Sequence, residues 1–396
     1  MQDFMISIPT QIYFGKTALD HLAEGIKRYG DRVLLVYGGS SIKSIGLYDR
    51  VTNILKDSGI FYVEHSGVES NPKVSHLRKG LEIAKSNNVN VILPVGGGSV
   101  IDEAKGIAGG LYSDVDPWDM AVSHKRLSHK IPPIITILTL AATGTEMSTG
   151  CNWTNDTLEI PEKLGFNGDE LRPKISFLDP QNTYSVSKFQ TGAGTSDIMS
   201  HVIESYFSNS TGSFLQARTG EAIMKTLVKY GPIAITDPTN YEARANLMLA
   251  GSWGNNGIIV KGNLVSWSVH AIEHELTAYN DTTHGEGLAI LTPHWMRWVL
   301  EDTSKLYRFV DFGINVFDID PLLSKNAIAE KAIAALENYF FHKLGMRSRI
   351  RDLNIPEDML ETFADRVATD GRLKYFEGAY RPMLREDVLR IYKAAY

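Results

Sequence analysis

Two short clusters in the second half of the chain combine the residue types and the spacing of a divalent metal site. Asp197 and His201 are four residues apart, as are His270 and His274, and His284 follows ten residues later. On a helix, residues at i and i+4 lie on one face, so each pair can reach a single ion. Each residue alone fits a capping or packing role equally well. Five of the eleven histidines nevertheless fall between residues 201 and 294, which favours a shared metal site.

The ligand types restrict the metal without selecting one. A carboxylate with imidazoles suits ferrous iron or zinc, whereas closed structural zinc sites usually contain thiolates. Spacing also leaves the ligand set open, because any two of His270, His274 and His284 can complete a site begun by Asp197 and His201.

A glycine-rich turn in the first half has the pattern of a phosphate site. Gly96–Ser99 follows an apolar, strand-like run and opens a helical segment at 100–108. Glycines allow the backbone to approach a ligand closely, and a helix N-terminus offers free N–H groups to a phosphate. The turn is not the G-x-G-x-x-G fingerprint, so an ordinary tight turn is the alternative.

A second turn, Gly38–Lys43, also links a strand to a helix. Two such turns at the carboxyl ends of strands favour a bound dinucleotide. Enzymes that select NAD usually place a carboxylate at the adenosine ribose, but here Gly38 and Gly39 are followed by Ser40, Ser41 and later Lys43, without an acid. NADP(H) is therefore favoured over NAD(H). The alternative is that both serines only cap the next helix.

The two halves of the chain differ in patterning. Up to about residue 185, short β-branched runs alternate with helical stretches such as 42–58 and 74–87, which predicts parallel strands joined by helical crossovers. From 186 to 396, amphipathic stretches at 220–230, 241–257 and 327–344 predict an all-helical domain. The expected strands are Arg32–Tyr37, Ile60–Glu64, Val89–Val95, Ile134–Leu138 and Ile175–Leu178.

Composition excludes several other classes of protein. The chain has 396 residues, 43% of them hydrophobic, which suits two globular domains. It has no apolar run of membrane-spanning length and no signal-peptide pattern, and its net charge of −6 argues against a nucleic-acid or membrane-surface partner. Its single cysteine, Cys151, excludes an internal disulfide and fits the cytoplasm.

Taken together, these segments resemble the iron-dependent alcohol dehydrogenase family, in particular its butanol-dehydrogenase-like and broad aldehyde-reductase-like members. The resemblance covers essentially the whole chain, with the motifs in the family's order. It rests on Ile8–Lys16, Asn71-Pro72, Gly96–Asp102 with Lys105, Leu138–Glu146, Phe177–Pro180, His274–Ala278 and His284–Pro293.

The resemblance implies roles for individual residues. It assigns the metal to Asp197, His201, His270 and His284, and it places His274 toward the substrate and nicotinamide as the proton-relaying catalytic residue. One departure from the family pattern is the segment 153–161, which is about two residues longer than usual. The implied cofactor residues are Gly97, Gly98, Ser99, Asp102, Thr139, Leu140, Thr143, Ser148 and Lys163.

The resemblance also implies an architecture and an activity. An α/β dinucleotide-binding domain at 1–185 precedes an all-α metal-binding and substrate domain at 186–396, as in dehydroquinate synthase-like proteins. The expected reaction interconverts small aliphatic aldehydes and primary alcohols with NADP(H), or alternatively NAD(H), and with Fe²⁺ or Zn²⁺ as Lewis acid. A polyol dehydrogenase and a non-catalytic metal-binding protein are the alternatives. The apolar segment Met5–Phe14 predicts a strand that pairs two subunits into a homodimer.

Overall fold

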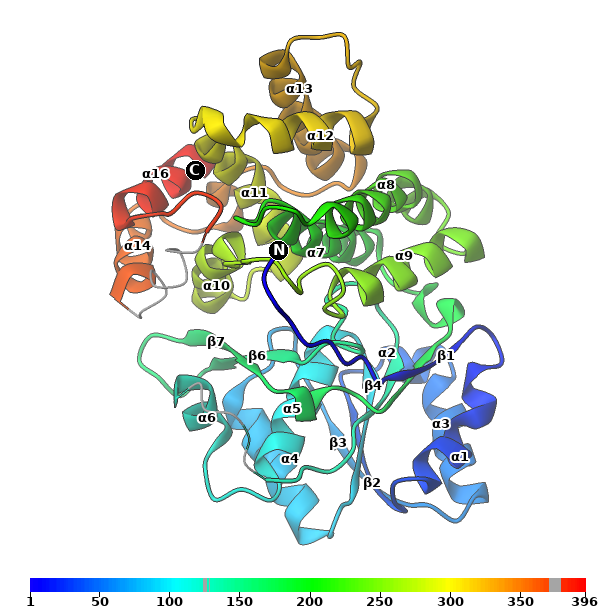
Figure 1. Ribbon diagram of the computed structural model, residues 1–396. Helices are drawn as coiled ribbons and strands as arrows, with labels where there is room; N and C mark the ends of the chain where they lie inside the picture. The colour runs from blue at the N-terminus through cyan, green and yellow to red at the C-terminus, as the bar shows by residue number, and fades with distance from the viewer. Residues whose placement is uncertain (124–126, 128, 370–378) are drawn as a thin grey trace. The chain divides into compact units, whose positions relative to one another are not determined.

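A computed structural model of the protein describes residues 1–123, 127, 129–369 and 379–396 (Figure 1). The chain divides into two compact units. One comprises Ser7–Val186, and the other comprises Ser187–Tyr396 together with Met1–Ile6. The sequence analysis assigns the first six residues to the N-terminal domain, but the structure groups them with the helical unit, where the Gln2 backbone N–H donates to the Gly262 carbonyl (3.1 Å).

The α/β unit is built on a parallel sheet of six strands within the described residues, in the order β1-β8-β5-β4-β2-β3. Its central strands are mostly apolar and are buried at every position except Arg32, as a parallel sheet covered on both faces requires. The strands are β1 (Gln11–Phe14), β2 (Arg32–Tyr37), β3 (Phe61–Ser66), β4 (Val91–Gly96), β5 (Ile135–Leu138) and β8 (Ile175–Leu178).

Alternate residues of β2 enter two different hydrophobic cores, one on each face of the sheet. Val33 and Leu35 pack with helices α1 and α3, whereas Leu34 and Val36 pack with α4 and α5. This period of two follows from the pleat of a strand, and it establishes the doubly wound arrangement that the alternating pattern predicts. The helices of this unit are α1 (Leu22–Lys27), α2 (Ser41–Ser44), α3 (Leu47–Asp57), α4 (Val74–Ser86), α5 (Gly98–Gly110) and α6 (Pro117–Ser123).

Two features of the α/β unit differ from the expected elements. The helix expected at 42–58 is interrupted at Gly46, which has a φ of 73° and separates α2 from α3. A hairpin also lies outside the main sheet, where β6 (Gly150–Asn155) pairs antiparallel with β7 (Glu162–Asn167). The long segment 153–161 thus supplies the end of β6 and the turn of this hairpin.

The second unit is helical throughout its described residues, and α7 lies at its centre (Figure 1). From Thr191 to Tyr206 every residue of α7 is buried. Its hydroxyls avoid a desolvation cost by donating to carbonyls one turn back, as Thr195 does to Thr191 (2.7 Å). The helices are α7 (Lys188–Tyr206), α8 (Phe214–Thr236), α9 (Tyr241–Gly254), α10 (Ser268–Asn280), α11 (His284–Leu300), α12 (Leu306–Phe317), α13 (Lys325–Glu337) with a π-helical turn at Asn338–Lys343, α14 (Met359–Thr369) and α16 (Arg385–Ala395). No helix among the described residues is long and apolar enough to cross a membrane.

Candidate metal centre and nucleotide-binding turns

Four side chains of the helical unit converge on one oxygen atom. Asp197 Oδ1 lies 3.3 Å from His201 Nδ1, 3.9 Å from His284 Nε2 and 4.0 Å from His270 Nε2. The helices α7, α10 and α11 supply these residues. Ligands bound at about 2.0–2.2 Å in a tetrahedral site lie roughly 3.3 Å apart, so the spacing of these atoms is close to that around a small divalent ion.

The buried nitrogen atoms at this point test whether a metal fits. His201 Nδ1 and His270 Nε2 form no hydrogen bond with any residue that the structure describes. A buried polar atom without a partner costs about 1–3 kcal/mol, whereas a ligated metal ion would satisfy both. Their position beside the Asp197 carboxylate therefore suits a divalent cation.

Two carboxylates behind the histidines hold the rings in orientation. Glu204 accepts from His270 Nδ1 and also from the backbone N–H groups of Val269 (2.7 Å) and His270 (3.2 Å). Glu273 accepts in the same way from His284 Nδ1. Such contacts fix the tautomer and leave Nε2 to ligate. Glu204 was not among the predicted site residues, although it follows Asp197 by two helical turns and lies on the same face of α7.

The electrostatics of the cluster keep His201 in its neutral form. Burial, reinforced by the nearby His270 and His284, lowers the pKa of His201 well below its ordinary value. Burial opposes protonation of His270 as well, but the Glu204 carboxylate outweighs it and raises the pKa of His270. Because metal ligation needs an unprotonated nitrogen, His201 is already in the required state at neutral pH.

Glycines let α11 approach closely enough to place His284 beside Asp197. A Cβ at Gly285 would lie 1.9 Å from the Ala193 carbonyl oxygen of α7, and a Cβ at Gly287 would lie 2.5 Å from Glu273 Oε1. A side chain at Gly285 would force α11 away from the α7 backbone, and one at Gly287 would displace the Glu273 side chain. The two glycines therefore fix the distance of His284 from both carboxylates.

Two further residues border the cluster. The ring centroid of His274 lies 5.7 Å from that of His284, one helical turn beyond His270, so His274 is adjacent to the four converging residues. Trp267 precedes α10 with a φ of 51°, a conformation that bulky residues rarely adopt. Its ring meets His201 and His270 edge-on at centroid distances of 5.8 and 5.3 Å, which gives this side of the cluster an apolar wall.

In the α/β unit, the first glycine turn packs against the Thr-rich loop. A Cβ at Gly97 would lie 3.0 Å from Leu140, and a Cβ at Gly98 would lie 2.6 Å from Thr143. The Thr139 backbone N–H donates to the Gly96 carbonyl (3.0 Å). The turn at the start of α5 and the loop after β5 thus pack directly against each other and form one continuous surface.

Behind this surface, Asp102 and Lys105 belong to a buried network. Thr145 Oγ1 donates to Asp102 (2.6 Å) and accepts from Lys105 Nζ, which also donates to the carbonyls of Gly150 (2.7 Å) and Ser148 (3.0 Å). Burial raises the pKa of Asp102 and lowers that of Lys105 to about 8. Asp102 and Ser148 are each only 7% exposed. Because its members are buried and bonded to one another, this network fixes the shape of the loop that follows β5.

The side chain of Lys163 is held deep in the hairpin. It lies on β7, is 5% exposed, and its Nζ donates to Asn71 Oδ1 (3.4 Å). The electrostatic influence of Lys163 also acts to lower the pKa of Asp102. This residue is therefore placed near the loop network rather than on the exposed part of the hairpin.

The second turn is open to solvent. Ser40, Ser41 and Lys43 are exposed, and no described atom lies within 4 Å of a Cβ built at Gly39. Lys43 Nζ stands 4.8 Å from the ring centroid of Tyr48. The turn therefore has space for a phosphate or for an added side chain.

The two tyrosines beside Lys43 both bind an acid, Glu64 of β3. Its carboxylate accepts from the hydroxyls of Tyr37 (2.6 Å) and Tyr48 (2.7 Å). The sequence analysis did not identify Glu64, because it is brought here by pairing of Leu35 with Glu64 in neighbouring strands. The carboxylate is already engaged by both hydroxyls.

Comparison with known proteins matches both units to one family. A family profile described as iron-containing alcohol dehydrogenase matches residues 9–180, and the C-terminal profile of the same family matches 191–396. The chain belongs to the iron-containing alcohol dehydrogenase family. This confirms the family and the fold class that the sequence predicts.

Relatives of this alcohol dehydrogenase family member align over its full length. It is 48% identical to NADH-dependent butanol dehydrogenase A of Clostridium acetobutylicum, with 100% of both chains covered. It is 32% identical to the NADPH-dependent aldehyde reductase YqhD of Escherichia coli, again over 100% of both chains. The crystal structure of NADH-dependent butanol dehydrogenase A from Thermotoga maritima superposes with a TM-score of 0.93 at 35% identity, covering 100% of this chain and 99% of the other.

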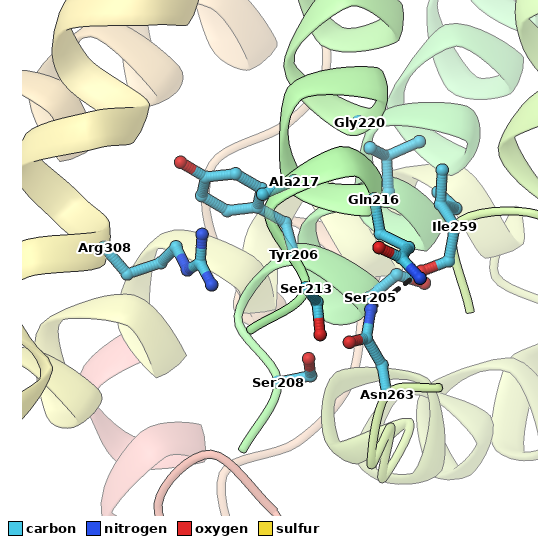
Figure 2. Close-up of a pocket in the computed structure, with 11 residues that line it drawn as sticks. Ser205, Tyr206, Ser208, Ser213, Gln216, Ala217, Gly220, Ile259, Asn263 and Arg308 are labelled. Atoms are coloured by element: carbon cyan, nitrogen blue, oxygen red, sulfur yellow. Dashed lines mark hydrogen bonds between the residues drawn. The ribbon is translucent and has the colours of Figure 1, made fainter. Parts of the chain in front are cut away.

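A small polar cavity in the helical unit is distinct from the residues expected to act in this alcohol dehydrogenase (Figure 2). Arg308 reaches in from one side and Gln216 and Asn263 from the other, with Ser213 between them. Each of these four has a buried polar atom that bonds to no described residue. The volume open to the centre of a water molecule is about 10 Å³, which is room for about one water. The cavity suits a bridging water and is too small for a substrate.

Proposed function

We propose that the protein is a metal-dependent, NAD(P)H-linked alcohol dehydrogenase and aldehyde reductase that interconverts small aliphatic aldehydes and primary alcohols. The observation that carries the proposal is the convergence of one carboxylate and three imidazoles on Asp197 Oδ1, in a chain that belongs to this family. Two relatives at 48% and 46% identity are named butanol dehydrogenases, which supports a short aliphatic substrate.

The proposed metal ligands are Asp197, His201, His270 and His284, holding Fe²⁺ or Zn²⁺. A bound ion supplies Lewis acidity toward the substrate oxygen, and a bound nicotinamide donates or accepts the hydride. The protein positions these ligands through Glu204 and Glu273, which prevent the rings of His270 and His284 from turning. Ligand removal should therefore abolish metal binding and activity together.

His274 is the proposed proton carrier. It stands next to His284, so it can exchange a proton with the substrate oxygen or with solvent. An imidazole titrates near neutrality when unperturbed, which suits it to both directions of the reaction.

The apolar wall formed by Trp267 supports an aliphatic substrate. Its indole lies edge-on to two of the proposed ligands, where a polyol would leave a hydroxyl facing an aromatic surface. Burying an unpaired hydroxyl costs roughly 1–3 kcal/mol. This favours aldehydes and primary alcohols over the polyols handled by glycerol-type enzymes.

The proposed nucleotide site lies in the α/β unit. Free N–H groups at the start of α5 suit the pyrophosphate, and the open turn after β2 suits the adenosine end. The residues proposed to contact or support the nucleotide are Gly38, Gly39, Ser40, Ser41, Gly97, Gly98, Ser99, Asp102, Thr139, Leu140, Thr143, Ser148 and Lys163.

For the cofactor itself we propose a preference for NADPH. Ser40 and Ser41 can donate hydrogen bonds to a 2′-phosphate, Lys43 attracts it, and the Glu64 carboxylate beneath the tyrosines is engaged by two hydroxyls. Relatives are named for both cofactors, NADH at 48% identity and NADPH at 32%. The preference is expected to be moderate, because an exposed charge is screened by water and salt.

The direct test is a cofactor-oxidation assay on metal-free protein reloaded with Fe²⁺ or Zn²⁺. Linear aldehydes of increasing length are offered with NADPH and then with NADH, and glycerol is offered in the oxidative direction as the polyol comparison. The proposal expects turnover of short aldehydes only after metal loading. Turnover of glycerol with no turnover of aldehydes would contradict it, as would full aldehyde activity without metal.

We also propose a homodimer. β1 forms one edge of the six-stranded sheet and pairs only with β8 among the described residues, so one side of its backbone is available to another strand. Pairing across a two-fold axis would give a closed dimer. Light scattering at micromolar concentration should give twice the chain mass, and a purely monomeric protein would contradict this.

A further inference from the structure

A second cluster of metal-ligating side chains lies inside the α/β unit. His65 of β3, His76 of α4 and Glu103 of α5 come from three separate elements. Both His65 Nε2 and His76 Nδ1 stand 2.7 Å from the same atom, Glu103 Oε1. The two imidazole rings stack with their centroids 4.2 Å apart. The sequence gives no hint of this cluster, because its members are 11 and 27 residues apart.

The buried carboxylate at the centre of the cluster favours positive charge beside it. Glu103 has no exposed surface, and a buried carboxylate is costly unless it is paired. Burial opposes its ionisation, but the His65 and His76 rings outweigh burial and hold the pKa of Glu103 below its ordinary value. Its second oxygen, Oε2, is buried and bonds to no described residue, so the carboxylate has an unused acceptor.

The surroundings hold both rings in place. His76 Nε2 lies 3.2 Å from the Ser66 carbonyl, which directs Nδ1 toward Glu103, much as carbonyls orient the remote nitrogen of metal-bound histidines. Gly80, inside α4, leaves room for the other ring, since a Cβ there would lie 2.8 Å from His65. A glycine within a helix costs about 0.5–1 kcal/mol relative to alanine, so this space is retained at a cost to the helix.

We propose that His65, His76 and Glu103 form a second divalent metal site, of the kind that binds Zn²⁺. Two imidazoles with one carboxylate are a ligand set of zinc, whereas Mg²⁺ and Ca²⁺ prefer oxygen alone. The His76 side chain is 24% exposed, which gives an ion a path from solvent and leaves a fourth position for water.

Binding would exchange protons for the ion. At 2.7 Å a proton lies between each ring nitrogen and Glu103 Oε1, and both must leave for the ion to bind: the proton on His76 passes to solvent, and the proton on His65 passes to solvent or to its other ring nitrogen. Ligands of a tetrahedral zinc ion lie roughly 3.3 Å apart. The contacts must therefore open by about 0.6 Å, which side-chain rotation can supply. The ion would then link β3 and α4 to α5, the helix that begins at Gly98.

The experiment measures bound zinc per chain by elemental analysis, after chelator treatment and reloading with Zn²⁺. Wild type should bind two equivalents, one at each cluster. His76→Gln should lose one of them, and the matched control His342→Gln, at an exposed histidine, should lose none. The double variant His270→Ala/His284→Ala removes the proposed catalytic ligands and should still bind one equivalent, with a zinc-dependent rise in melting temperature.

The outcomes separate the two sites. Equal zinc content in wild type and His76→Gln would overturn the second site, and so would a folded His270→Ala/His284→Ala variant that binds no zinc. The latter measurement decides the matter even if His76→Gln fails to fold. A single equivalent that is lost in His76→Gln but kept in the double variant would support the second site and contradict the catalytic metal.

Discussion

Replacing Gly285 with alanine should disrupt the metal centre from a position that contributes no ligand. The new Cβ would lie 1.9 Å from the Ala193 carbonyl oxygen, whereas relaxed contact needs about 3.5 Å. Helix α11 must therefore move from α7 by roughly 1.5 Å, and His284 moves with it. A metal site tolerates errors of only about 0.2 Å in ligand distance, so this displacement should remove His284 from the ion. Overpacking of this kind also costs about 1–3 kcal/mol of stability.

The assay compares bound metal and melting temperature in Gly285→Ala and in a matched control. Gly220→Ala places a methyl group in α8 of the same unit, 3.3 Å from a Val202 methyl carbon, which a small side-chain shift can absorb. We expect Gly285→Ala to lose metal and melt several degrees lower, while Gly220→Ala keeps both. A Gly285→Ala protein with full metal content and an unchanged melting temperature would refute the role assigned to close helix packing.

Three further predictions concern single residues. His274→Ala should keep its metal but lose turnover and alter the pH profile; unchanged kinetics would instead assign His274 a packing role. Gly39→Asp fits the open turn and should shift the ratio of kcat/KM for NADPH over NADH toward NADH, by repelling the 2′-phosphate. A wild type that already prefers NADH, or a variant with an unchanged ratio, would show that this turn does not read the ribose. Burial lowers the pKa of His294 from 6.5 to about 4, so between these values the folded chain binds fewer protons than the unfolded chain. Stability should therefore fall by at most about 3 kcal/mol as the pH drops from 6.5 to 4. His294→Gln should flatten this part of the urea-unfolding profile, and an equally steep fall in the variant would exclude His294 as its source.

The main sheet was largely predictable because its central strands are buried on both faces. The bounds of β2 and β8 match the expected Arg32–Tyr37 and Ile175–Leu178, since continuous apolar runs bounded by polar turns have few alternative structures. The β6–β7 hairpin was missed because its strands carry asparagine, lysine and glycine, which weaken the strand pattern. Only its packing against α5, for instance through Trp153 Nε1 to the Asp102 carbonyl (3.0 Å), shows why it forms.

For the metal centre, sequence spacing identified the residue types, and the family resemblance selected among them. The ligand set stays a prediction, although the structure brings His270 and His284 within 4.0 Å of Asp197. The supporting residues were not predicted, although Glu204 shares a face of α7 with Asp197. Glu204 and Gly285 act through contacts between helices. No local sequence pattern predicts that the Glu204 carboxylate contacts His270, which is 66 residues away.

The most direct test of the central claim is the metal content and activity of His270→Ala and His284→Ala. Each variant is purified, reloaded with Fe²⁺ or Zn²⁺ and assayed with a short aldehyde and NADPH or NADH, while zinc at His65, His76 and Glu103 is counted separately through His76→Gln. Loss of one metal equivalent together with loss of aldehyde reduction in both variants is the predicted result. Either alanine variant that retained its full metal content, or full activity, would contradict the assignment of Asp197, His201, His270 and His284 as the catalytic metal site.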